Sequence, residues 1–132
     1  YAKNKLIPSP EKKKYSKEHV IILIFIYYYK NLLSINDIRS LLDPLVKRYF
    51  GKDKDFSVTD IYDEVTKSEY FDIAGMKEKI RESFEQSKTM FSDESEEDKE
   101  FLQTFSFICM LAFDVYVKKM IIERMLDDLN KN

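Results

Sequence analysis

The sequence is short of the residues from which catalytic and metal sites are built. Tryptophan is absent, and the 132 residues include one histidine, one cysteine, two glycines and three prolines. A single cysteine, Cys109 in the apolar run FSFICMLAF, excludes a disulfide or a thiolate metal cluster within one chain and fits a reducing cytoplasm. One histidine and two isolated glycines exclude a Ser–His–Asp set and a glycine-rich phosphate loop. We therefore predict a protein that is not an enzyme and that carries no metal ion or cofactor.

The scarcity of turn residues also bears on the fold. With 44% hydrophobic and 35% charged residues, helix formers dominate, and we predict an all-α protein of one domain with a small appendage. The run Val20–Tyr29 holds ten apolar or aromatic residues without a break, whereas a membrane span needs about 20. We expect a buried helix there and no contact with a membrane. We also expect no signal peptide, because the charged start leads into prolines.

Charge is divided unevenly along a chain whose formal net charge is −2. The first seventeen residues contain six lysines and one glutamate, a formal charge of +5, so the remaining 115 residues carry −7. Such a division indicates contact with a polyanion at one end of the chain. A solvated terminus is the alternative interpretation.

Two serines mark the starts of two helices in the N-terminal half. Ser16 and Ser34 are good N-cap residues, and they predict helices over residues 17–31 and 35–49. Asp37 approximates the third position of a capping box. A two-residue link forces the helices into a hairpin. The prolines at positions 8 and 10 hold the preceding segment extended, and we expect at most a vestigial β-wing over residues 10–15.

The C-terminal part is predicted to form three further helices. Apolar spacing indicates one helix from Ser57 or Thr59 and a second after a break between Ser68 and Gly75. An acidic run over residues 92–100 suits the N-terminus of a last helix over about residues 96–129. Its apolar face comprises Phe101, Phe105, Ile108, Leu111 or Ala112, Val115, Ile122, Met125 or Leu126, and Leu129. A face of that length exceeds what one chain covers, so we predict a homodimer that pairs through this helix.

The start of the chain resembles the MerR-type winged helix-turn-helix. The resemblance is carried by Tyr1, by the LIP sequence at residues 6–8, by a basic connector ending at Tyr15, and by the helix starts SKEHV and SINDIRSLL. More closely, residues 4–38 resemble an uncharacterised family of small bacterial proteins with a MerR-like start. The resemblance implies a partial winged-helix DNA-binding region over residues 1–50, with most of its recognition helix before Tyr1. Residues 51–132 would be a helical dimerisation or effector region.

The resemblance further implies a cytoplasmic transcriptional regulator that binds double-stranded DNA as a homodimer. Lysines on a wing would contact phosphates, which supply affinity rather than sequence information. The predicted phosphate contacts are Lys3, Lys5, Lys12, Lys13, Lys14, Tyr15 and Lys17. Tyr15 has an alternative role as a packing residue that closes the wing against the helices. We predict that His19 is a helix-start residue rather than a metal ligand.

A second class of function remains open. The aromatic side chains Tyr28, Phe105 and Tyr116 would line an apolar pocket for a small-molecule effector, although aromatic residues at such spacing are also typical of a core. The chain would then be an interaction or effector-binding protein on a degenerate winged-helix scaffold that no longer binds DNA. Fold analogy does not decide between the two classes.

Overall fold

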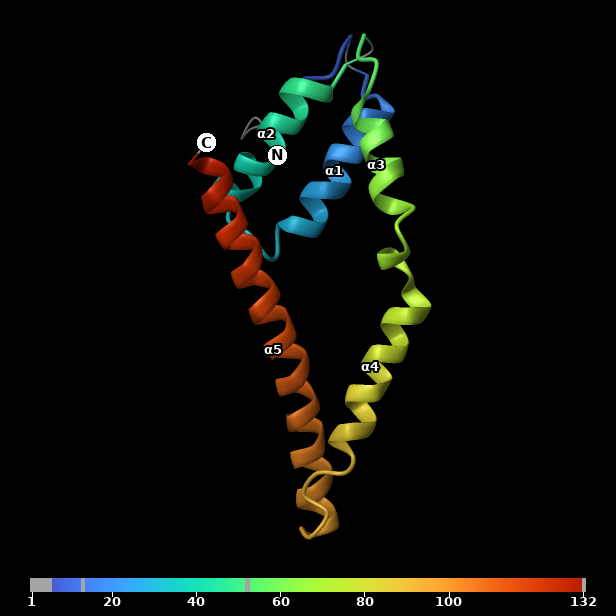
Figure 1. Cartoon of the computed structure of the whole chain (residues 1–132), viewed down its shortest axis with the longest axis vertical. Coiled ribbons are helices and arrows are strands. Elements are labelled where there is room, and N and C mark those ends of the chain that lie inside the picture. The colour runs from blue at the N-terminus through green and yellow to red at the C-terminus, as the bar shows by residue number, and fades with distance from the viewer. Residues whose placement is uncertain (1–5, 13, 52, 132) are drawn as a thin grey trace. The chain divides into compact units, whose positions relative to one another are not determined.

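The chain is almost entirely helical in the computed structural model, which describes residues 6–12, 14–51 and 53–131. The elements are α1 (Lys17–Tyr29), α2 (Ile35–Tyr49), α3 (Val58–Thr66), the short 3-10 helix η2 (Glu69–Phe71), α4 (Ile73–Ser87) and α5 (Glu96–Asn130) (Figure 1). Within the described ranges there is no β-strand, and a single isolated bridge joins Glu11 to Lys14. The predicted all-α fold with a long final helix is confirmed.

Local capping explains where the first two helices begin. The Ser16 and Ser34 hydroxyls accept hydrogen bonds from the backbone N–H groups of His19 and Asp37, at 3.4 and 3.1 Å. These bonds satisfy amides that have no partner inside the first helical turn. The start at Lys17 and the bounds of α2 are as predicted. The predicted end of α1 is wrong by two residues, because the N–H groups of Leu32 and Leu33 both donate to the carbonyl of Tyr29 and close the turn there.

The first compact unit comprises Tyr1–Ser68 together with Ile121–Asn132. In it α1, α2 and α3 pack against one another (Figure 1). The core they share consists of Leu6, Ile7, Ile21, Ile22, Ile26, Leu33, Ile38, Leu42, Val58 and Leu126. Leu6 and Ile7, directly before Pro8, are therefore an integral part of this core.

The second compact unit, Glu69–Met120, is a helical hairpin made of α4 and most of α5. Asp72 caps α4 by accepting from the N–H groups of Ala74 and Gly75, both at 3.1 Å, which places the end of the predicted break. The contacts between residues thus divide the chain into two compact units after Ser68. The resemblance to MerR proteins predicted a functional division after Phe50, and that division stays a prediction. Neither α5 nor any other helix in the described part combines the length and apolar character needed to cross a membrane.

Candidate nucleic-acid interface

A lysine-bearing turn links the buried N-terminal segment to α1. Leu6 and Ile7 are buried, and the chain then reverses at residues 11–14, where the Lys14 N–H donates to the Glu11 carbonyl at 2.9 Å. Lys12 follows Glu11 with φ +51°, in the left-handed region. We call residues 11–14 the lysine turn. Because Lys12 and Lys14 are both exposed, this turn presents positive charge to solvent.

The His19 side chain contacts the residues on both sides of the lysine turn, Ser9 before it and Ser16 after it. Its side chain is buried at 4% exposure, its Nδ1 accepts from the Ser16 N–H at 3.0 Å, and its Nε2 lies 3.3 Å from the Ser9 carbonyl oxygen. Since Nδ1 accepts, the ring proton is on Nε2 and is donated to Ser9. One imidazole thus contacts both the N-terminus of α1 and the residue two positions before the lysine turn.

Residues at the C-terminal end of α2 contact His19 and its neighbour Glu18. The Phe50 ring meets the imidazole edge to face at 4.9 Å between centroids. The next residue, Gly51, has φ +132°, a conformation that glycine adopts without strain, and its N–H donates to the Glu18 carboxylate at 3.3 Å. The lysine turn therefore rests on a site built by α1 and by the C-terminal end of α2.

Tyr15 makes a packing contact of the kind that one of its two predicted roles requires. Its ring meets the His19 ring edge to face at 5.1 Å, while 58% of its surface stays exposed. The packing contact is present, and a bond from its hydroxyl to phosphate stays a prediction.

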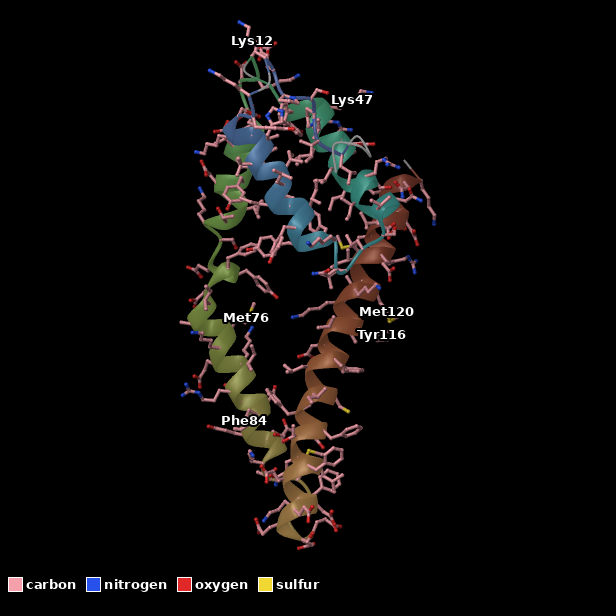
Figure 2. All side chains as sticks on the ribbon, turned by 180° about the vertical axis from the view of Figure 1, so that it is seen from behind. Lys12, Lys47, Met76, Phe84, Tyr116 and Met120 are labelled. Carbon is pink, nitrogen blue, oxygen red and sulfur yellow. The ribbon has the colours of Figure 1, made fainter. Side chains whose placement is uncertain are left out.

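Further cations lie near the lysine turn. Lys17 is exposed in the first turn of α1, and Lys47 and Arg48 are exposed in the last turn of α2. Lys47 lines a hollow together with Leu6 and Pro8 of the buried segment, and Figure 2 shows it at the same end of this unit as Lys12. Sequence reasoning did not select Lys47 or Arg48. The predicted contacts Lys3, Lys5 and Lys13 lie outside the described residues.

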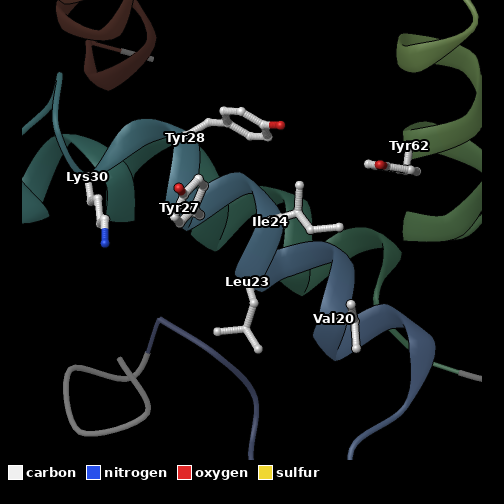
Figure 3. Close-up of a pocket in the computed structure, with 7 residues that line it drawn as sticks. All are labelled: Val20, Leu23, Ile24, Tyr27, Tyr28, Lys30 and Tyr62. Atoms are coloured by element: carbon white, nitrogen blue, oxygen red, sulfur yellow. The ribbon is translucent and has the colours of Figure 1, made fainter.

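The predicted effector-pocket residues belong to different units. Tyr28 lines an open hollow on α1 with Val20, Leu23, Ile24, Tyr27, Lys30 and Tyr62 (Figure 3). The Lys30 ammonium lies 5.1 Å from the Tyr27 ring centroid, so the hollow has a cationic edge. Phe105 and Tyr116 are instead exposed on α5, eleven residues apart, which corresponds to about 16 Å along a helix.

Burial changes the pKa of one tyrosine in α1. Tyr29, adjacent to the hollow, stacks on Phe25 at 6.2 Å between centroids and packs against the core. Loss of solvent raises the pKa of its phenol above the ordinary value. Tyr29 therefore acts as an apolar packing residue.

Sequence reasoning placed His19 correctly at a helix start but missed its anchoring role. The available signal was the spacing of Ser16 and His19, which matches that of a capping box with histidine in the place usually taken by Glu or Gln. Among the described residues, no group of three or more His, Cys, Asp or Glu side chains is placed to hold a metal ion.

Comparison with known protein families finds a match in the N-terminal half of the chain. Residues 1–65 match the family described as Domain of unknown function (DUF1836). No curated protein and no solved structure matches the chain. The DUF1836 range takes in the lysine turn, α1, α2 and all but the last residue of α3. The predicted similarity to an uncharacterised family is thus confirmed, and the affiliation with MerR proteins stays a prediction.

Proposed function

We propose that this chain is a cytoplasmic DNA-binding regulator of the MerR-like winged-helix type, which contacts duplex phosphates through the lysine turn. The observation that carries the proposal is the conformation of Lys12. A left-handed residue at a turn is usually glycine, and a side chain there costs about 1 kcal/mol. A strained position occupied by an exposed lysine supports a role for its charge.

The surroundings of the turn support the same function. Lys14 and Lys17 add charge on one side, and Lys47 and Arg48 lie at the adjoining end of α2. Glu18, the nearest acidic residue of α1, is engaged with the Gly51 N–H. Phosphate contacts depend on cations that are presented together, and the buried His19 contacts Ser9 before the lysine turn and Ser16 after it.

Binding to duplexes of random sequence tests this proposal. We expect fluorescence anisotropy to show binding to a labelled duplex at low salt, and the affinity to fall steeply as salt is added, because released counterions dominate phosphate binding. Selection of bound fragments from random DNA would then define any preferred site. A chain that leaves the anisotropy of every duplex unchanged even at low salt would contradict the proposal.

A second function is favoured by the apolar outer side of α1. Val20, Tyr27 and Tyr28 are 51%, 64% and 67% exposed and line the hollow of Figure 3, although a helix that is apolar on all sides is usually covered. If DNA binding fails, the chain is better explained as an interaction or effector-binding protein. Chemical-shift changes at these three residues on adding an aromatic ligand would support that alternative.

A further inference from the structure

The side of α1 that points away from the core is apolar. It comprises Val20, Leu23, Ile24, Tyr27 and Tyr28, which we call the outer face of α1. At 64% and 67% exposure, the two tyrosine side chains alone present roughly 200–330 Å² to solvent. Contiguous apolar patches of a few hundred Å² on a soluble protein often mark sites of interaction. The outer face is therefore a candidate for contact with another molecule.

The spacing of the outer face suits a second helix. Val20, Ile24 and Tyr27 follow one another at intervals of four and three, the spacing of a helix-pairing seam. Beside α1, α3 contributes Tyr62, whose ring meets Phe25 edge to face at 6.0 Å between centroids. Figure 3 shows Tyr62 pointing from α3 toward α1. The two helices thus form a shallow groove, and amphipathic helices bind such grooves through anchors at intervals of three and four.

The open form of the hollow favours a protein partner over a small molecule. Sites for small molecules are concave and enclose most of the surface of the ligand. Five of the seven residues that line the hollow are exposed, and Ile24 and Tyr62 are half-buried. A small ligand lying there would keep one side in water. A helix that lies along α1 can instead turn its polar side outward and bury its apolar side.

The charges at the two ends of α1 indicate which kind of helix the outer face accepts. Between Glu18 and Lys30 the sequence has no Lys, Arg, Asp or Glu. Among the residues that line the hollow, all of them described, Lys30 is the one charged side chain. Lys17, in the first turn of α1, is exposed as well, whereas Glu18 is engaged with the Gly51 N–H. Positive charge therefore brackets the apolar face, with about 20 Å along the helix between the two lysines.

We propose that the outer face of α1 binds an amphipathic helix of a protein partner, one whose apolar residues recur at intervals of three and four and are flanked by carboxylates. The apolar residues lie against Val20, Ile24 and Tyr27, and the carboxylates pair with Lys17 and Lys30. An interface of this size is typical of transient partners. The proposal does not rest on DNA binding, because the lysine turn does not line the groove. It gives the alternative function, that of an interaction protein, a partner of defined chemistry.

A labelled synthetic helix is the probe for the first test. Its central turns carry leucine at intervals of three and four, and both of its ends carry glutamate. A second peptide has lysine in place of every glutamate. Fluorescence anisotropy without DNA is expected to show that the acidic peptide binds the chain roughly tenfold more tightly than the basic one, because the pairs at both ends change from attraction to repulsion. Equal affinity for the two peptides, or binding of neither, would overturn the proposal.

Reversal of the charge at Lys30 locates the bound peptide. Lys30→Glu is expected to weaken binding of the acidic peptide by roughly threefold to tenfold and to strengthen binding of the basic peptide. The matched variant Lys77→Glu changes the net charge equally at an exposed lysine of α4, and it is expected to leave both affinities unchanged. An equal response of the two variants would reveal an effect of net charge alone and would contradict the proposal.

Polar substitution of the outer face tests what covers it. Val20→Ser, Tyr28→Ser is expected to weaken binding of the acidic peptide about tenfold, with unchanged helical content by circular dichroism, because both side chains are exposed. Phe113→Ser, Tyr116→Ser alters two exposed rings of α5 and is expected to bind the peptide like the wild type. Sedimentation is expected to give the same mass for the wild type and the α1 variant. A lower mass for the α1 variant would mean that a second copy covers the face, which would overturn the proposal.

Discussion

Replacement of Lys12, Lys13 and Lys14 by alanine is expected to reduce the steepness of the salt dependence of duplex binding by about two to three units on a log–log plot. Each phosphate contact contributes about −0.9 to that slope, and the triple variant removes up to three contacts. Binding should weaken to the same degree on every duplex sequence, because phosphate contacts carry no base information. Anisotropy titrations at several salt concentrations measure both effects.

A matched variant separates a local contact from loss of charge in general. Lys67→Ala, Lys77→Ala, Lys79→Ala removes the same number of charges from the C-cap of α3 and from α4, and its salt dependence is expected to equal that of the wild type. Lys67 is paired with Glu64 at 2.8 Å, but both side chains are about 70% exposed, so the pair contributes little to stability. Equal slopes for the two triple variants would contradict a role for the lysine turn.

A variant at Lys12 also separates an effect on thermal stability from an effect on duplex binding. Lys12→Gly places glycine at a left-handed position, so thermal stability should stay within about 1 kcal/mol of the wild type. Duplex binding should weaken nonetheless, because one phosphate contact is lost. Unchanged binding in this variant would mean that Lys12 does not contact DNA.

Removal of the His19 ring is expected to destabilise the first compact unit by about 3 kcal/mol, measured by urea unfolding. His19→Ala deletes the acceptor for the Ser16 N–H, the donor to the Ser9 carbonyl, and the ring contacts with Tyr15 and Phe50. Duplex binding should weaken together with stability, because the lysine turn loses its anchor.

Two comparison variants identify the cause of that loss. His19→Gln supplies the side chain usually found at this capping position, so it should recover part of the lost stability through the Ser16 N–H. Tyr28→Ala removes a ring that is 67% exposed and should change stability by no more than about 0.5 kcal/mol. A His19→Ala variant as stable as Tyr28→Ala would show that the imidazole does not anchor the turn.

Local chemistry explains which elements were predictable from the sequence. The N-caps at Ser16 and Ser34 act on amides three residues away, and the starts of α1 and α2 followed from them directly. The acidic start of α5 and its long apolar spacing likewise predicted a helix that the structure places at Glu96–Asn130. Such signals lie within a few residues of the feature that they specify.

Contacts between distant residues explain what the sequence did not reveal. The imidazole of His19 reaches the Ser9 carbonyl ten residues earlier and the ring of Phe50 after the end of α2, and neither contact leaves a periodic signal. The left-handed backbone at Lys12 was equally hidden, because its usual marker, glycine, is missing. Lys47 was missed because cations in a last helical turn are common, and its proximity to Pro8 depends on packing.

The central claim, that the lysine turn touches duplex DNA, is tested most directly by chemical protection. The chain is acetylated briefly with and without a saturating random-sequence duplex, and mass spectrometry measures the modification of each lysine. We expect the duplex to protect Lys12, Lys13, Lys14 and Lys17 several-fold, while Lys77 and Lys79 on α4 react at the same rate in both samples. Protection that is absent from the lysine turn, or equal at all these lysines, would contradict the account.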